Sequence, residues 1–129
     1  MIGNILIVDQ DYSHRGLLQA LLEKKGYRVH VLEDDGTIND ILKQEPFDIL
    51  FLDSQTIKIR GGKFLSDIKK SYPASHIIIV TSKRGNGFVK EAMSVGAYGC
   101  VYKPFRNDEV LTMIRHLVPN ERIKNAKNS

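Results

Sequence analysis

The chain has 129 residues, 42% of them hydrophobic and 26% charged, which is the size and composition of one globular domain. No apolar run approaches the ~20 residues of a membrane-spanning helix, and no basic segment precedes the first apolar run, which argues against a secretory signal. The small net charge of +4 comes from scattered residues and does not predict nucleic-acid binding, while a single cysteine, Cys100, excludes an internal disulfide and fits a reducing cytoplasm.

Five short apolar runs recur along the chain and predict five strands. They are Ile5–Val8, Tyr27–Leu32, Ile49–Leu52, Ile77–Val80 and Cys100–Tyr102. The first, third and fourth are almost uninterrupted Ile, Leu, Val and Phe, which is typical of strands buried on both faces of a parallel sheet.

Apolar residues at one-turn spacing predict helices between these strands. The clearest groups are Leu17, Leu18, Leu21 and Leu22; Phe64, Leu65 and Ile68; Val89, Ala92 and Met93; and Val110, Leu111, Ile114, Leu117 and Val118. Gly26 and Gly96 supply stop signals, and Asn107 or Asp108 is the expected N-cap of the last helix. Strands that alternate with helices in this way predict an α/β fold with a parallel sheet and helices on both faces.

The composition becomes polar beyond Pro119. We therefore expect one folded domain over residues 1–118, followed by a polar tail or the start of a linker over residues 119–129. A solvated tail accounts for the basic residues found there.

A polar residue follows four of the five apolar runs. These residues are Asp9, Asp53, Thr81 and Lys103. In an open parallel sheet the carboxyl ends of the strands meet at one edge, where ligands bind. The pattern predicts a polar crevice that holds two carboxylates, a hydroxyl and an ammonium, but it does not by itself define a reaction.

Four segments together resemble the receiver domain of two-component response regulators. They are Ile5–Asp9 (ILIVD), Phe47–Asp53 (FDILFLD), Ile77–Ser82 (IIIVTS) and Gly96–Phe105 (GAYGCVYKPF). The resemblance runs from about Asn4 to Leu117. It implies a doubly wound, five-stranded parallel sheet in the order 2-1-3-4-5 with five helices.

The resemblance implies that Asp53 accepts a phosphoryl group from a sensor histidine kinase, a phosphotransfer protein or a small acyl phosphate. Two carboxylates about 4 Å apart repel each other by about 4 kcal/mol at an effective dielectric constant near 20, so a cation is needed. By resemblance, Mg²⁺ is held by Asp9, Asp53 and the backbone carbonyl of Gln55.

The resemblance also assigns roles to two residues on later strands. Thr81 is expected to donate its hydroxyl to a phosphoryl oxygen, and Lys103 to pair with the phosphoryl group or with Asp53. The peptide bond between Lys103 and Pro104 is expected to be cis.

The chain departs from the family at the residue after Asp9. The family usually has a second acid there that binds the metal directly, and this chain has Gln10. Gln10 offers a neutral oxygen, so we expect weakened Mg²⁺ binding rather than none. Asp11 could compensate by reaching into the site.

A second departure is Cys100, which stands where the family usually has a Tyr or Phe coupled to Thr81. A small side chain cannot make the ring movement of the usual switch, which puts the usual output in question. Tyr98 or Tyr102, which flank Cys100, could take over this role. Cys100 itself is interpreted as a small buried apolar residue.

Further features lie in the loops. The segment Ser54–Arg60 lacks the proline common in the family and carries Lys58 and Arg60, which are either solvated or attract an anionic donor. The glycine-rich segment Ser82–Gly87 is expected to be mobile. The four histidines lack ligand spacing and are interpreted as structural or solvated: His14, His30, His76 and His116.

Three functions remain open at this stage. The first is a cytoplasmic signalling receiver that is no enzyme beyond autophosphorylation and autodephosphorylation, with a downstream effector domain or protein and a possible homodimer through its fourth and fifth helices. The second is a pseudo-receiver that binds proteins without phosphorylation. The third is a phosphatase of the haloacid-dehalogenase type, suggested by Asp9-Gln-Asp11, with Asp9 as the nucleophile. Neither a membrane nor a nucleic acid is expected as a partner.

Overall fold

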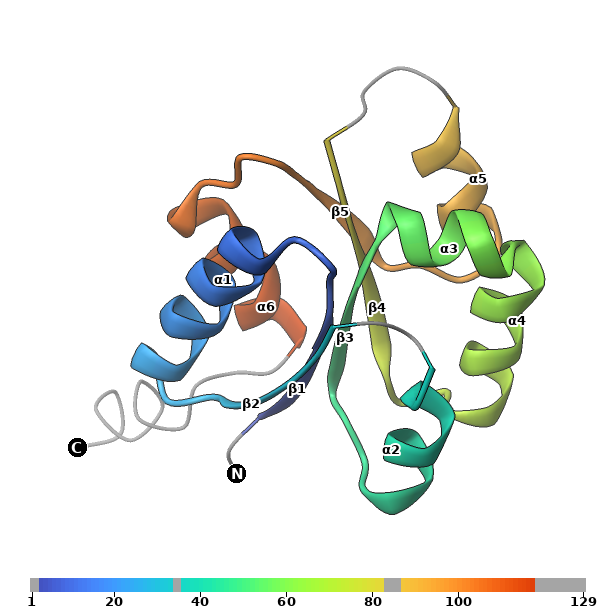
Figure 1. Ribbon diagram of the computed structural model, residues 1–129, viewed down its shortest axis with the longest axis horizontal. Helices are drawn as coiled ribbons and strands as arrows, with labels where there is room; N and C mark the ends of the chain where they lie inside the picture. The colour runs from blue at the N-terminus through green and yellow to red at the C-terminus, as the bar shows by residue number, and fades with distance from the viewer. Residues whose placement is uncertain (1–2, 34–35, 83–86, 118–129) are drawn as a thin grey trace.

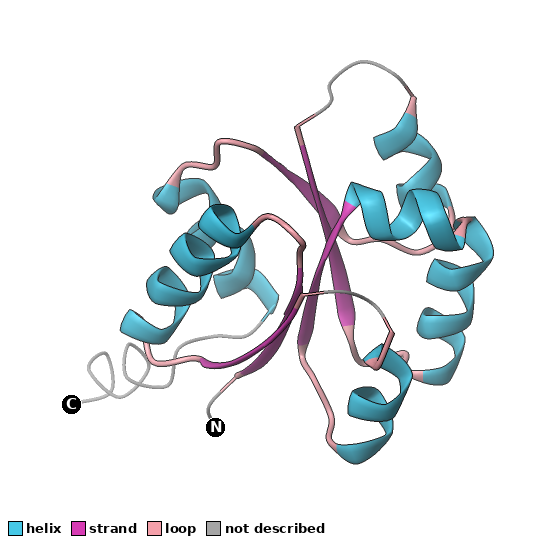
Figure 2. Cartoon of the chain, viewed as in Figure 1, coloured by secondary structure: helices cyan, strands magenta, loops and turns pink. Residues whose placement is uncertain are grey.

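The computed structural model describes residues 3–33, 36–82 and 87–117 of the chain. Strands and helices alternate within these residues (Figures 1 and 2). The elements are β1 (Asn4–Val8), α1 (Tyr12–Lys24), β2 (Arg28–Leu32), α2 (Ile38–Gln44), β3 (Ile49–Asp53), α3 (Ser54–Arg60), α4 (Gly62–Ser71), β4 (His76–Thr81), α5 (Phe88–Ser94), β5 (Gly99–Tyr102) and α6 (Asn107–Leu117).

The five strands form one parallel sheet in the order β2-β1-β3-β4-β5, as expected. The first strand therefore lies between β2 and β3, and the strand order reverses at β1. The carboxyl ends of the strands lie at the top of the view in Figure 1, where α1 and α3 begin. Parallel topology thus brings residues far apart in the sequence to one edge.

Alternating side chains of the central strands build a separate core on each face of the sheet. Leu6, Leu50 and Ile79 point to one face and pack with residues of α2, α4 and α5. Ile7 and Phe51 point to the other face and pack with α1 and α6. Figure 2 shows the same division, with α1 and α6 on one side of the sheet. Each fully buried side chain of this kind contributes about 1.5–3 kcal/mol of transfer free energy, so the cores hold the strand ends in fixed register.

All five predicted strands are confirmed, each within one residue at either end. Asp53 and Thr81 are the last residues of β3 and β4 rather than the first residues after them. The expected N-cap of the last helix is wrong, because α6 begins at Asn107 and the Arg106 carbonyl accepts the first helical hydrogen bond from Val110. Val118 and the predicted tail, residues 119–129, lie outside the described residues.

The described residues form six helices rather than the expected five. The additional helix is α3, which occupies the segment Ser54–Arg60 that was expected to be a loop. The segment has no proline to interrupt a helix, and the side chain of Asp53 caps the first turn. Gly61, with a φ of 86°, ends α3, and α4 starts at the next residue.

Two glycines provide a test of this backbone. Gly96 has a φ of 121°, and a Cβ atom there would lie 2.7 Å from the Lys69 Cγ. We expect Gly96→Ala to lower the free energy of unfolding by about 1–2 kcal/mol, because L-residues are strained at positive φ. Gly16 lies within α1 and has open space around it. Gly16→Ala should raise the same quantity by about 0.5–1 kcal/mol. Urea denaturation measures both, and a Gly96→Ala variant as stable as the wild type would contradict the described turn.

Candidate functional site

Two buried carboxylates lie at the carboxyl edge of the sheet. Asp9 directly follows β1 and is 1% exposed, and Asp53 ends the neighbouring strand β3 and is 4% exposed. The backbone amide of Gln10 donates a hydrogen bond to Asp53 Oδ2 over 3.3 Å. This bond joins the ends of β1 and β3. The expected convergence of Asp9 and Asp53 is therefore present in the fold.

Protein groups surround the Asp9 carboxylate on both oxygens. Oδ1 accepts hydrogen bonds from the Asp11 amide at 2.9 Å and from Lys103 Nζ at 3.3 Å. Oδ2 lies 3.1 Å from His14 Nδ1. The backbone carbonyl of Asp9 accepts from Arg15 Nη1 at 2.9 Å. Protein side chains and backbone amides thus supply the positive charge and the hydrogen-bond donors around Asp9.

These contacts outweigh the effect of burial on the pKa of Asp9. Burial acts to raise the pKa, but the hydrogen bonds from His14 and the Asp11 amide and the charge of Lys103 hold it below the ordinary value of 3.8. The pKa of Asp11 is also lowered, chiefly by the hydrogen bond that its side chain accepts from the His14 amide. Both acids are therefore charged at neutral pH.

The Asp53 carboxylate is held by the first turn of α3. Its Oδ1 accepts hydrogen bonds from the Thr56 amide at 3.0 Å and from the Thr56 hydroxyl. Its Oδ2 accepts from the Gln10 amide. Asp53 is thus the N-cap of α3, and Gln55 is the second residue of that helix. A helical carbonyl points toward the C-terminal end of its helix, so the Gln55 carbonyl points away from Asp53.

The last two strands bring Thr81 and Lys103 to the same edge. Thr81 ends β4 with 1% exposure, and its carbonyl accepts a hydrogen bond from the Lys103 amide at 2.8 Å. The Lys103 ammonium lies 3.3 Å from Asp9 and 3.5 Å from Asp11. The expected Lys103–Asp53 pair is not formed among the described residues. The peptide bond from Lys103 to Pro104 is cis, as the resemblance implied.

The side chains at this edge of the sheet are of types that bind Mg²⁺, but their arrangement in the structure does not present a complete set of ligands. Asp9 and Asp53 are hard oxygen donors of the kind that Mg²⁺ prefers. Their oxygens are already engaged by protein donors, Gln10 replaces an acid, and the Gln55 carbonyl points elsewhere. Within the described residues no three His, Cys, Asp or Glu side chains form a group that could hold a metal ion. The expectation of weak Mg²⁺ binding stays a prediction. Asp11 does not complete the set, because it caps α1 and pairs with Lys103.

Comparison with known proteins identifies the family. The family model described as the response regulator receiver domain matches residues 5–115. The chain belongs to this family. Receiver domains are modules of two-component signalling, and this membership replaces the phosphatase alternative that Asp9-Gln-Asp11 suggested.

Individual relatives agree with this assignment. The chain is 31% identical over 126 residues to an NtrX-like response regulator of Rickettsia felis, covering 94% of this chain and 26% of that protein. It therefore spans about a quarter of the length of that relative. A response regulator from Thermotoga maritima has the same fold, with a TM-score of 0.83, 19% identity and coverage of 92% of this chain and 98% of that one. The beryllofluoride-activated NtrC4 receiver domain dimer gives a TM-score of 0.80 at 28% identity, covering 88% of this chain and 94% of that one.

The receiver site contains a histidine whose place at the site was not predicted. His14 was interpreted as structural or solvated, but it is buried, contacts Asp9 and packs edge-on against Phe105. A signal was present in the sequence, because His14, Leu18 and Leu22 recur every four residues and share the buried face of α1. The capping role of Thr56 was also missed, since it depends on the segment after Asp53 being helical.

Of the two tyrosines considered as substitutes for the usual switch aromatic, Tyr102 lies near Thr81 and Tyr98 does not. Tyr102 pairs in register with Thr81, so it lies beside the predicted switch residue. Tyr98 stacks on His76 at the start of β4, with ring centroids 5.7 Å apart. About five strand residues, or ~16 Å, separate that end from Thr81, so the expectation that Tyr98 could substitute is wrong. Cys100 is partly buried and packs against the core beneath α5, as expected for a small apolar side chain.

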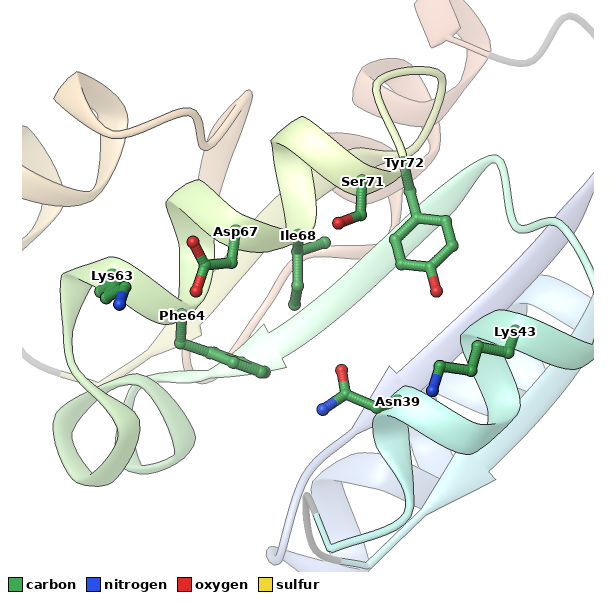
Figure 3. A pocket seen from close by; sticks show the side chains of 8 residues that line it. All are labelled: Asn39, Lys43, Lys63, Phe64, Asp67, Ile68, Ser71 and Tyr72. Carbon is green, nitrogen blue, oxygen red and sulfur yellow. The ribbon is translucent and has the colours of Figure 1, made fainter.

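Other candidate features lie apart from the acids. The side chains of Lys58 and Arg60 and most of the expected mobile segment, residues 83–86, lie outside the described residues. A pocket of about 420 Å³ separates α2 from α4, with Asn39 and Lys43 on one wall and Asp67 on the other (Figure 3). None of the predicted site residues lines it.

The lowered pKa of Asp9 predicts a specific acid sensitivity. Because the unfolded chain takes up a proton on Asp9 at a higher pH than the folded chain does, this carboxylate stabilises the fold above about pH 3.8. That stabilisation is lost as the pH falls through the lower folded value. Denaturation of wild type and Asp9→Asn between pH 7 and pH 3 should show a shallower acid-induced loss in the variant. Equal slopes would contradict the described contacts of Asp9.

Proposed function

We propose that this receiver takes a phosphoryl group onto Asp53 from a phosphohistidine on a sensor kinase or phosphotransfer protein. The observation that supports this most strongly is the placement of Asp53 at the edge where Thr81 ends β4 and where Asp9 and Lys103 directly follow β1 and β5. An Asp53 oxygen attacks phosphorus, a new P–O bond forms, and the P–N bond of the donor breaks. The donor imidazole leaves with its bonding electron pair and takes up a proton.

The neighbouring residues have complementary roles in this proposal. The Thr81 hydroxyl donates to a phosphoryl oxygen, and the Lys103 ammonium moves from Asp9 and Asp11 toward the incoming charge. Asp9 and Asp53 would hold Mg²⁺, which offsets negative charge on the phosphoryl group when it is bound. Beyond accepting phosphate and losing it to water, the domain carries out no chemistry in this account.

A cleft between α1 and α6 is suited to receive the phosphohistidine donor. It has a volume of about 640 Å³, and His14 and Phe105 line it together with Leu17. His14 also contacts Asp9, so the cleft borders the acid site. Leu17 is 66% exposed, which leaves an apolar side chain of this cleft available to a partner.

The wider assembly is also part of the proposal. Because the chain spans about a quarter of its NtrX-like relative, we place an effector domain or effector protein downstream of the receiver. The receiver dimer of NtrC4 supports pairing of two copies as a route for the signal. None of the helices in the described part of the chain is long and apolar enough to cross a bilayer. The cytoplasm, where phosphohistidine donors are found, is the proposed location.

A second candidate is a pseudo-receiver that binds partners without phosphorylation. Two observations favour it specifically: Gln10 replaces an acid, and every Asp53 oxygen is already hydrogen-bonded. In that case the same surfaces would bind partners whatever the state of Asp53.

The first test measures phosphoryl transfer directly. Incubation with Mg²⁺ and a small acyl phosphate should add one phosphoryl group to the wild type, read by intact mass, and none to Asp53→Asn. Removal of Mg²⁺ should slow the reaction. An unmodified wild type, under conditions that label an ordinary receiver, would favour the pseudo-receiver instead.

The second test separates the donor-binding cleft from the chemistry. Leu17→Ala should slow transfer from a phosphohistidine donor roughly 5- to 30-fold, the effect of losing an apolar interface anchor of ~1–2 kcal/mol. Its rate with a small acyl phosphate should not change, because that donor needs no docking surface. Met93→Ala removes an exposed apolar side chain of α5 and is the matched control. Equal slowing with both donors would contradict a docking role for Leu17.

A further inference from the structure

One hydroxyl group holds the predicted phosphoacceptor in place. Thr56 donates both its amide and its side-chain hydroxyl to the same oxygen, Asp53 Oδ1. Both residues are buried, with 5% and 4% exposure. These bonds are charge-assisted, which makes them stronger than bonds between neutral groups. The oxygen that would bind a metal or attack phosphorus is thus engaged by its own chain.

The same contact keeps a second predicted ligand away from the site. Asp53 caps α3, a helix of only seven residues, and helices this short depend on their caps and packing. While α3 is intact, the Gln55 carbonyl points along the helix and cannot face Asp53. Gly61, at a positive φ, separates α3 from α4, so the two helices are distinct segments of the backbone.

We propose that Thr56 is a positioning residue that keeps the receiver in a closed, metal-poor state, which opens when the first turn of α3 unwinds. This inference rests on the proposed function and adds its regulation. Opening would free Asp53 Oδ1 and turn the Gln55 carbonyl toward the acids.

The test compares three variants in the intact chain. Thr56→Val keeps the shape of the side chain and removes the hydroxyl, while Thr56→Ser keeps the hydroxyl. Thr37→Ala is the matched control, because Thr37 occupies the N-cap position of α2, also seven residues long, without a side-chain capping bond. Mg²⁺ affinity is measured by isothermal titration and backbone opening by amide hydrogen exchange over residues 54–60.

Thr56→Val should bind Mg²⁺ roughly 2- to 10-fold more tightly than the wild type, the range expected from one hydrogen bond. Its α3 amides should exchange faster by a similar factor. Thr56→Ser and Thr37→Ala should match the wild type in both measurements. Thr56→Val with unchanged or weaker Mg²⁺ binding would overturn the proposal, as would unchanged exchange in α3.

These readouts do not depend on phosphorylation. If no variant accepts a phosphoryl group, the proposed function fails, while affinity and exchange still decide the role of Thr56. If the wild type is phosphorylated but Thr56→Val has wild-type affinity and exchange, the proposed function stands and the closed state is refuted. Faster phosphorylation of Thr56→Val together with tighter Mg²⁺ binding supports both.

Discussion

The burial of two carboxylates at one edge of the sheet is the constraint on which the site depends. Asp9 directly follows β1 and Asp53 ends the neighbouring strand β3, so the pairing of these strands brings the two acids together whatever their charge. A buried charge is stable only when it is paired and hydrogen-bonded. The surrounding chain satisfies this requirement with Lys103 from β5, His14 from α1 and amides of the loops. The cores on both faces of the sheet fix the positions of these groups.

Asp53 has two roles that compete for one oxygen. As the N-cap of α3 it stabilises a short helix, and in the proposed function it would have to release that cap to accept a phosphoryl group. The backbone amide of Gln10 holds the other Asp53 oxygen, and the Gln10 side chain would give a metal ion a weaker ligand than the usual acid does. In the proposed function, weak metal binding and the capping of Asp53 would both reflect a preference of the site for the state without ligand.

The sequence predicts those features that depend on strand pattern and chain order. Short apolar runs predict the five strands, the polar residues after them predict the convergence of Asp9, Asp53, Thr81 and Lys103, and the resemblance implies the sheet order. The sequence does not predict α3, because a seven-residue segment next to a strand shows little periodicity. Its helical state also depends on a cap that the Asp53 side chain supplies. The contact between His14 and Asp9 is not predicted from the sequence either, because it depends on how α1 packs against the sheet rather than on the spacing of ligands along the chain. Tyr98 cannot substitute because it precedes β5, at the opposite end of the sheet from Thr81, and alternation says which face a residue shares but not how far along the strand it lies.

The most direct test of the central claim is to locate the phosphoryl group on the chain. After reaction with a small acyl phosphate, borohydride reduction converts a phosphorylated aspartate to homoserine, and peptide mass spectrometry identifies its position. We expect homoserine at residue 53 and an unchanged Asp9, because Asp9 is held by Lys103 and His14 whereas Asp53 is held by a helix cap and the Gln10 backbone amide. Homoserine at residue 9, or at neither position, would contradict the account.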